Sequence, residues 1–258
     1  MTQTRNWLTG TSARRQVAGL NLAVRRAIRD VRLGVRVERA IREKRWKDPS
    51  VREVVRRFHR IYYSANRRTW RNTHWRGVPV FKCPLDLWVY QEILHEVRPD
   101  LIVEAGTKHG GSAYHLASIC DLLGHGAVVT IDINPLPNRP AHPRITYVTG
   151  SSTDPSVVGQ VDERIVDGSS VMVILDSDHS REHVLAELDI WHSRVSIGSY
   201  LIVEDTNING HPVTENLGPG PWEAVTEWLP RHPGFRRDAT REKFFLTFNP
   251  RGYMKRVA

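Results

Sequence analysis

The chain has 258 residues and a formal net charge of +9, which is enough length for one α/β domain with an extension and too little for a second full domain. Its two cysteines, Cys83 and Cys120, have no paired spacing and no nearby Cys/His cluster, which excludes a disulfide framework and a structural zinc site and favours a cytoplasmic setting. The N-terminus lacks the apolar core of a signal peptide, and no apolar run approaches the roughly 20 residues of a membrane span.

The positive charge is concentrated in the first sixty residues. Residues 1–60 hold fifteen Arg and two Lys against five acids, a net charge of +12, so residues 61–258 carry −3. From about residue 16 to residue 46, apolar side chains recur at helical spacing with arginines opposite them. We therefore predict a basic helical extension over residues 1–65 that packs on its own domain or on a second copy, making a homo-oligomer. Peripheral contact with an anionic membrane, nucleic acid or an acidic partner is the alternative.

Two more helices are predicted before the first strand. Residues 51–63 and residues 85–97 both show helical spacing, and prolines interrupt the chain before the first and after the second. The stretch between them, residues 70–84, is aromatic, rich in turn residues and poorly periodic. It indicates a connecting segment placed to cap an active site.

From residue 101 onward, strand and helix patterns alternate. The predicted elements are strands at 101–104, 127–132, 145–149, 171–176 and 199–205, helices at 112–123, 154–166, 180–194 and 221–229, and a closing pair of strands near 235–238 and 243–248. Two of these strands are almost wholly apolar, as expected where helices cover both faces of a sheet. The pattern predicts an α/β fold over residues 66–258, with a Rossmann-like, doubly wound, mostly parallel sheet whose ligands lie beyond the carboxyl ends of its strands.

A glycine-rich loop follows the first strand of this alternation, which ends at Glu104. Gly106, Gly110 and Gly111 let backbone N–H groups approach a ligand closely, and the helix that begins near Ser112 directs its positive end at the loop. The arrangement suits a nucleotide-like cofactor. A steric need for glycine at a tight strand-to-helix turn explains the loop equally well when it is taken alone.

The ends of the next two strands supply further cofactor candidates. Asp132 ends the second strand, where an acidic side chain can accept hydrogen bonds from both hydroxyls of a ribose. The third strand ends just before Ser152, near the expected position of an adenine ring. A helix-capping turn ahead of Asp154 accounts for this serine equally well.

Several carboxylates follow the fourth and fifth strands. The fourth ends in Asp176 and continues to Asp178 and His179, and the fifth ends in Glu204 and Asp205. At one edge of a sheet these acids repel one another by on the order of several kcal/mol unless a cation lies between them. Oxygen ligands select magnesium, calcium or manganese over zinc, so we predict a hard divalent cation held by Asp176, Glu204 and Asp205. A helix cap explains Asp178.

Five segments of the chain together match one known family. They are Tyr-Gln-Glu at 90–92 with Arg-Pro-Asp at 98–100, Val-Glu-Ala-Gly at 103–106 with His-Gly-Gly-Ser at 109–112, Gly-Ser-Ser-Thr-Asp-Pro at 150–155, Leu-Asp-Ser-Asp-His-Ser-Arg-Glu-His-Val at 175–184, and Gly-Ser-Tyr-Leu-Ile-Val-Glu-Asp at 198–205. With these segments, the chain resembles the cephalosporin-hydroxylase-like family of S-adenosylmethionine-dependent O-methyltransferases, which includes macrolide-sugar and rhamnosyl O-methyltransferases. The resemblance covers roughly residues 75–250 and assigns no role to the arginine-rich extension.

The resemblance implies a class I methyltransferase fold, S-adenosylmethionine as cofactor and a magnesium ion. The ion's ligands would be Asp176, Glu204 and Asp205, with His179 as the general base. The implied cofactor contacts are Glu104, Gly106, Ser112, Asp132, Ser152 and Asp176.

Three other side chains are candidates for contact with the methyl acceptor. His109 lies in the glycine loop, His211 closely follows the fifth strand, and Trp222 begins a helix where its ring can stack on a sugar face. For His109 the alternative is that it completes its turn, and for Trp222 the alternative is core packing.

The expected reaction is methyl transfer to a hydroxyl of a sugar, glycoside or glycosylated metabolite. Such a hydroxyl has a pKa far above neutrality, so magnesium lowers that pKa and orients the oxygen while His179 removes the proton. A phenolic or catechol-like acceptor is one alternative. A nucleic-acid-associated methyltransferase that uses the basic extension is another, although the fourth strand ends in Asp-Ser-Asp-His and not in an Asn-Pro-Pro-Tyr loop. A non-catalytic scaffold is the remaining alternative.

Overall fold

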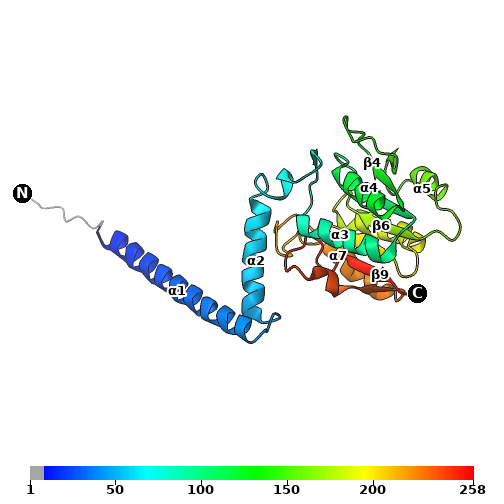
Figure 1. Cartoon of the computed structure of the whole chain (residues 1–258). Coiled ribbons are helices and arrows are strands. Elements are labelled where there is room, and N and C mark those ends of the chain that lie inside the picture. Colours follow the sequence, from blue (N-terminus) through cyan, green and yellow to red (C-terminus); the bar gives the residue numbers. More distant parts are fainter. Residues whose placement is uncertain (1–8) are drawn as a thin grey trace, which may run out of the picture. The chain divides into compact units, whose positions relative to one another are not determined.

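The computed structural model describes residues 9–258, with side chains from residue 22 onward. The chain divides into two compact units, Met1–Arg57 and Phe58–Ala258. The first unit contains α1 (Thr9–Arg42) and the start of α2 (Pro49–Ser64), which are blue and cyan in Figure 1. Among the described residues, no helix combines the length and the apolar character that crossing a membrane requires.

The long helix predicted for the basic extension is present as α1, with 34 residues. Ala40 on α1 and Val51 on α2 are buried, and Arg57 of α2 lies 3.3 Å from Asp30 of α1. The apolar side chains at intervals of three or four along another side of α1 are exposed, namely Val24, Ile28, Val31 and Val35. The unit therefore leaves an apolar stripe of α1 exposed beside its arginines.

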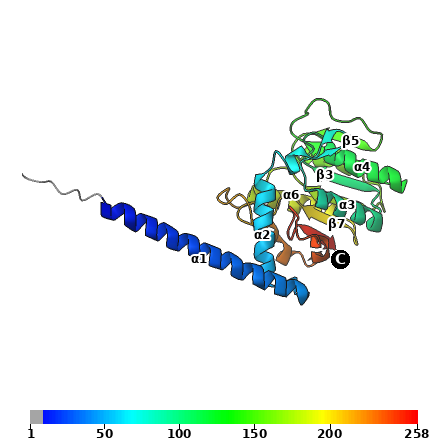
Figure 2. The ribbon, with the colours of Figure 1, turned by 60° about the vertical axis from the view of Figure 1, so that its left-hand side comes forward.

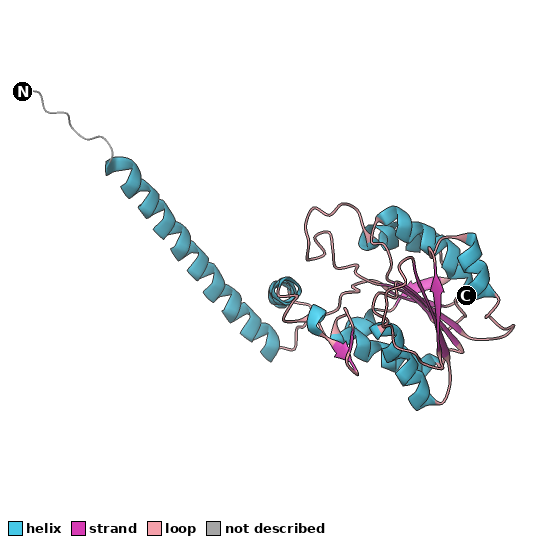
Figure 3. Ribbon diagram, turned by 90° about the horizontal axis from the view of Figure 1, so that it is seen from above, coloured by secondary structure: helices cyan, strands magenta, loops and turns pink. Residues whose placement is uncertain are grey.

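The second unit is built on a seven-stranded sheet with helices on both faces (Figure 3). Its strands are β3 (Leu101–Ala105), β4 (Ala127–Asp132), β5 (Ile145–Thr149), β6 (Val171–Leu175), β7 (Tyr200–Val203), β8 (Phe235–Arg237) and β9 (Tyr253–Arg256). Their order is β5-β4-β3-β6-β7-β9-β8, in which the first five strands pair in parallel and the last two antiparallel. The predicted doubly wound, mostly parallel sheet is confirmed.

Five helices cover the two faces of this sheet. One face carries α3 (Pro84–Val97) and α4 (Gly111–Leu123), and the other carries α5 (Pro155–Asp162), α6 (Arg181–Trp191) and α7 (Pro221–Trp228). Successive residues of β3 belong to opposite cores, since Leu101 and Val103 pack with α5–α7 and Ile102 packs with α3 and α4. Burial on both faces explains why these strands are continuously apolar.

Short elements complete the second unit. A two-stranded antiparallel hairpin joins β1 (His74–Trp75) and β2 (Val78–Pro79). Single 3-10 turns occur at η1 (Trp70–Asn72), η2 (His192–Arg194), η3 (Leu229–Arg231) and η4 (Ala239–Glu242). The hairpin lies in the segment predicted to cap the active site, just before α3.

The prediction of a strand at residues 243–248 is wrong, because β8 pairs instead with β9. Phe245 has a left-handed φ of 63°, which breaks an extended chain. Leu246 and Phe248 are buried in an aromatic cluster with Trp70, so the aromatic alternation serves that cluster and not a sheet face. The helix predicted at 154–166 also ends early, at Asp162.

The direction of the strand order changes between β3 and β6. In doubly wound sheets, ligands bind where the order reverses, beyond the carboxyl ends of the strands. β3, β6 and β7 are adjacent in the sheet, and Figure 2 labels β3 and β7 in that sheet. Side chains that follow these strands are therefore placed at one common edge.

Candidate active site

Three carboxylates meet at this edge, and we call Asp176, Glu204 and Asp205 the acidic cluster. Asp176 directly follows β6, and Glu204 and Asp205 directly follow β7, its parallel neighbour. Asp205 has a left-handed φ of 52°, and its backbone N–H donates to Asn249 Oδ1 at 3.2 Å. The parallel pairing of β6 with β7 thus gathers acids that are distant in the sequence.

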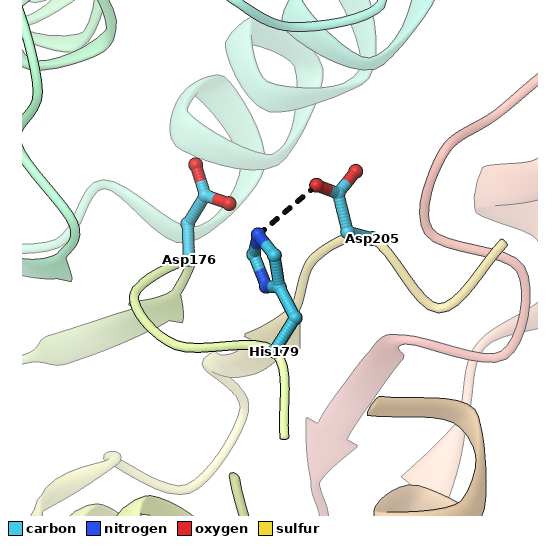
Figure 4. Close-up of side chains that lie close together, drawn as sticks. All are labelled: Asp176, His179 and Asp205. Carbon is cyan, nitrogen blue, oxygen red and sulfur yellow. Dashed lines mark ion pairs between the residues drawn. The ribbon is translucent and has the colours of Figure 1, made fainter. Parts of the chain in front are cut away.

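His179 lies between two of these acids (Figure 4). Its Nε2 atom is 3.2 Å from Asp205 Oδ2. One ligand atom from each of Asp176, His179 and Asp205 lies within 4.8 Å of the other two, and all three residues are partly exposed. The spacing is that of a metal site, and the structure brings together two of the three predicted metal ligands, Asp176 and Asp205, and the predicted base, His179.

Glu204 is oriented differently from the other two acids. Lys82 Nζ lies 2.5 Å from Glu204 Oε1 and 2.5 Å from Asp176 Oδ2. Tyr90 Oη also donates to Glu204 Oε1, at 2.6 Å. Both donors use the same oxygen of Glu204, so Oε2 is the oxygen that can face an ion. The role of Glu204 as a metal ligand stays a prediction.

Burial and mutual repulsion shape the pKa values in the acidic cluster. Burial raises the pKa of all three carboxyls above their ordinary values, against the attraction of Lys82 and, for Asp176 and Asp205, of His179. Burial alone would lower the pKa of His179, but the carboxylates of Asp205 and Asp176 reverse that shift and raise it. The carboxylates also raise the pKa of Lys82 against burial, which keeps its ammonium charged. A bound cation would relieve the same repulsion.

The glycine loop passes directly against the end of β6. A Cβ atom on Gly106, whose φ is 98°, would overlap the backbone oxygen of Asp176. A Cβ atom on Gly111 would likewise overlap the backbone oxygen of Pro79. Glycine is therefore required at both positions for packing, because the loop lies against the backbone of β6 and of the segment after β2.

Glu104 and Ser112, both predicted cofactor contacts, are bonded to each other. Glu104 is fully buried and accepts hydrogen bonds from Ser112 Oγ and, at 2.7 Å, from Thr130 Oγ1. Burial raises the pKa of Glu104, against the opposing charge of Lys82. These bonds connect β3 to α4 and to β4 next to the glycine loop. Direct contact of either residue with a cofactor stays a prediction.

Asp132 lies at the end of β4 beside the glycine loop. Its two oxygens accept hydrogen bonds from the backbone N–H groups of Lys108, at 2.7 Å, and of Asn134, at 2.8 Å. Arg139 lies 3.5 Å from the oxygen that Lys108 contacts. The carboxylate is thus held in place next to the loop, where the predicted ribose contact would be made.

Ser152 belongs to a second group of polar side chains, which we call the Glu187 cluster and which contains Ser152, Ser177, His183 and Glu187. The hydroxyls of Ser152 and Ser177 both donate to Glu187 Oε1, at 2.5 and 2.6 Å. His183 Nε2 lies 3.1 Å from Ser177 Oγ. Glu187 is fully buried, and its Oε2 has no partner among the described residues. The cofactor role of Ser152 stays a prediction.

The three predicted acceptor contacts lie in two places. The His109 ring meets the edge of Phe81 at 5.2 Å between centroids. His211 stacks on Trp222, with ring centroids 4.3 Å apart, and its Nε2 lies 2.7 Å from Glu223 Oε1. Trp222 is partly exposed and belongs to none of the hydrophobic core clusters of the described residues. Contact of any of the three with an acceptor stays a prediction.

Known proteins resemble this chain in sequence and in fold. The family model for Rhamnosyl O-methyltransferase/CmcI matches residues 67–257. The Rhamnosyl O-methyltransferase of Mycobacterium tuberculosis is 40% identical over 213 residues, covering 79% of this chain and 85% of that protein. The Mycobacterium leprae protein of the same name is 37% identical over 210 residues, covering 79% and 90%. The apo-structure of CmcI has a TM-score of 0.56 at 23% identity, covers 73% of this chain and 77% of its own, and shows the same fold.

Proposed function

Because the chain belongs to the Rhamnosyl O-methyltransferase/CmcI family and is therefore an O-methyltransferase, we propose that it transfers the methyl group of S-adenosylmethionine to a hydroxyl of a sugar residue. The acceptor class follows the relatives named Rhamnosyl O-methyltransferase. The observation that carries the proposal is that His179 lies between Asp176 and Asp205, and that Asp176 lies against the glycine loop. The family resemblance predicted from the sequence is confirmed.

Magnesium is the metal that we propose for the acidic cluster. CmcI, which shares the fold, is known as a complex with Mg and SAM. In this chain, Asp176 and Asp205 offer carboxylate oxygens within 4.8 Å of His179, and oxygen donors suit a hard divalent ion. When bound, the ion supplies Lewis-acid chemistry that lowers the pKa of an acceptor hydroxyl and orients it.

The protein's own side chains would perform the proton transfer and the positioning. His179 accepts the proton of the acceptor hydroxyl, and Asp205, 3.2 Å away, stabilises the resulting imidazolium. The acceptor oxygen forms its bond to the methyl carbon as the carbon–sulfur bond breaks, which leaves S-adenosylhomocysteine. The glycine loop and Asp132 would hold S-adenosylmethionine, and positioning of the reactants can supply up to about 7–11 kcal/mol.

The test combines binding with an acceptor panel. Calorimetric titration of the purified chain with S-adenosylmethionine should show binding, and methyl transfer should occur to an aryl rhamnoside when magnesium is present. Catechol and a short RNA are the comparison acceptors. Turnover of catechol without turnover of the rhamnoside would support the phenolic alternative, and absence of cofactor binding would refute the proposed reaction.

For residues 1–65 we propose a packing or oligomerisation arm. The exposed apolar residues of α1, such as Val31 and Val35, support this role because two thirds of each side chain's surface is accessible, at 67% and 65%. Deleting residues 1–45 should then lower the molecular mass of the particle in solution. An unchanged mass with lower stability would indicate packing on its own domain. Unchanged mass and stability, with steeply salt-dependent binding of lipid or RNA by the full chain, would favour the alternatives.

We also propose a cytoplasmic location. Cys83 and Cys120 are both buried and unpaired, as in proteins of reducing compartments. Fractionation of cells that produce the full chain would test this, with recovery outside the cytoplasmic fraction as the contrary result.

A further inference from the structure

Lys82 reaches the acidic cluster from a segment whose backbone is held by contacts on both sides. It follows the hairpin of β1 and β2, where the backbone N–H of Val80 donates to Thr73 O at 2.9 Å. The backbone oxygen of Pro79 packs against Gly111 so closely that no Cβ fits there. The segment that carries Lys82 is therefore fixed, and its ammonium is held in place at the cluster.

The ammonium of Lys82 occupies one oxygen of each of two carboxylates. It lies 2.5 Å from Asp176 Oδ2 and 2.5 Å from Glu204 Oε1, and Tyr90 holds the same Glu204 oxygen. The Lys82 side chain is only 4% exposed, so water does not compete for these bonds. Asp176 and Glu204 can then each present a single oxygen to a cation, and neither can bind it through both oxygens.

Lys82 also sets the charge that an ion meets. When the three carboxylates of the acidic cluster are ionised around a cation they carry −3, and the Lys82 ammonium reduces this to −2 while His179 is neutral, the form in which it can accept a proton. One divalent cation balances −2. Without the ammonium, the cluster would keep an excess negative charge that favours additional or more highly charged ions.

We propose that Lys82 is a specificity-determining residue that makes the acidic cluster prefer magnesium to calcium, an inference that rests on the proposed metal-dependent function. Magnesium requires about six ligands in octahedral geometry and uses carboxylates through single oxygens, whereas calcium takes about six to eight oxygens and commonly binds both oxygens of a carboxylate. Lys82 blocks two-oxygen binding by Asp176 and Glu204, and it removes one negative charge. Both effects work against the larger ion.

The test measures metal binding directly. The wild type, Lys82→Met and Lys82→Gln are freed of metal with a chelator and titrated separately with magnesium chloride and calcium chloride in a calorimeter. Lys82→Met should raise the affinity for calcium relative to magnesium by about tenfold or more, because two carboxylates become free to bind through both oxygens. Lys82→Gln keeps a hydrogen-bond donor without the charge and should change the ratio by less.

Lys243→Met is the matched control. Lys243 also pairs with a carboxylate, at 2.7 and 2.6 Å from the two oxygens of Glu92, but it lies at the surface with 45% of its side chain exposed. Its removal should leave the ratio of calcium to magnesium affinity unchanged. Circular dichroism confirms that each variant is folded before titration.

Each outcome decides the inference. A folded Lys82→Met with the wild-type affinity ratio would overturn it while leaving the proposed function intact. If neither Lys82 variant folds, the wild type decides, because the inference requires it to bind magnesium about tenfold or more tightly than calcium. Equal affinities would overturn it. A wild type that binds neither ion would overturn both the proposed metal site and the role of Lys82.

Discussion

The acidic cluster and the Glu187 cluster are two polar groups built from the same region of the sheet, and they balance charge in opposite ways. The acidic cluster has three carboxylates and only one ammonium, with His179 3.2 Å from Asp205. The Glu187 cluster has a single carboxylate that accepts hydrogen bonds from two hydroxyls. An excess of buried negative charge lowers the stability of a fold unless a bound cation neutralises it. A carboxylate that accepts hydrogen bonds can instead stabilise the fold without any ligand. We therefore propose chemistry for the acidic cluster and a structural role for Glu187, while the cofactor contact of Ser152 stays a prediction.

The largest effect should come from Asp205→Asn. We expect metal-dependent methyl transfer to be abolished, a greater loss than the roughly 10²–10⁴-fold that removal of a general base causes. Stability without metal should stay equal or rise, because burial raises the pKa of this carboxyl and asparagine tolerates its left-handed φ of 52°. Turnover and thermal unfolding in chelator measure the two effects. A large fall in stability would place Asp205 with the structural network instead.

Separate substitutions of His179 and of His183, on α6, test whether the chemistry belongs to the acidic cluster alone. His179→Gln should lower kcat by about 10²–10⁴-fold with little change in cofactor affinity, because it removes the proposed base. His183→Gln is the control, since His183 contacts Ser177 of the Glu187 cluster. Steady-state kinetics on both variants decide the matter. Equal losses of kcat would contradict the assignment of chemistry to the acidic cluster alone.

A substitution in the Glu187 cluster should lower the free energy of unfolding more than it lowers magnesium affinity. Glu187→Ala removes a fully buried carboxylate that accepts hydrogen bonds from Ser152 and Ser177, which should cost about 2–4 kcal/mol of unfolding free energy. Denaturant unfolding measures this, and magnesium affinity of the folded variant should stay within about twofold of wild type. A strong loss of magnesium binding would show that the two clusters act as one.

The smallest expected effect concerns His115, which lies outside both clusters and changes how the free energy of unfolding depends on pH. Burial lowers the pKa of His115 on α4 to about 4, and its Nδ1 has no partner among the described residues. Since the unfolded pKa is about 6.5, the unfolded state binds the proton first, and stability falls as pH drops from 6.5 toward 4. Between pH 7 and pH 5 the wild type should lose about 2 kcal/mol more than His115→Gln.

Measuring the difference between the two proteins isolates His115 from acids with the opposite sign. Burial raises the pKa of Asp86 to about 7, so its contribution to stability increases as pH falls through that value. Denaturant unfolding at the two pH values gives the required free energies. Parallel pH profiles for wild type and His115→Gln would show that this histidine titrates normally in the folded protein.

The sequence predicted the parts of the molecule that periodicity controls. The apolar runs of β6 and β7 identified parallel strands, and an acid directly after each run then had to reach the same edge of the sheet. This reasoning placed Asp176 and Asp205 together, and the family motif added His179. It failed at residues 243–248, where an aromatic alternation typical of a strand fills a cluster around Trp70.

The partners of the acidic cluster were not predictable in the same way. Lys82 lies in an aperiodic segment 94 residues before Asp176, and only the packing of Pro79 against Gly111 directs it into the cluster. Glu187 lies on a helix whose spacing suggests nothing about Ser152 and Ser177. Long-range contacts from loops leave no local pattern in the sequence. The acids could therefore be predicted, but their counter-ion, Lys82, could not.

The most direct test of a cation-dependent site is methyl transfer from S-adenosylmethionine to a rhamnoside, measured in chelator and then during titration with magnesium. We predict no transfer in chelator, saturable recovery on addition of magnesium, and no recovery in Asp205→Asn. Full activity of the wild type in chelator would contradict the account, because the three carboxylates at the ends of β6 and β7 would then have no role that requires a metal.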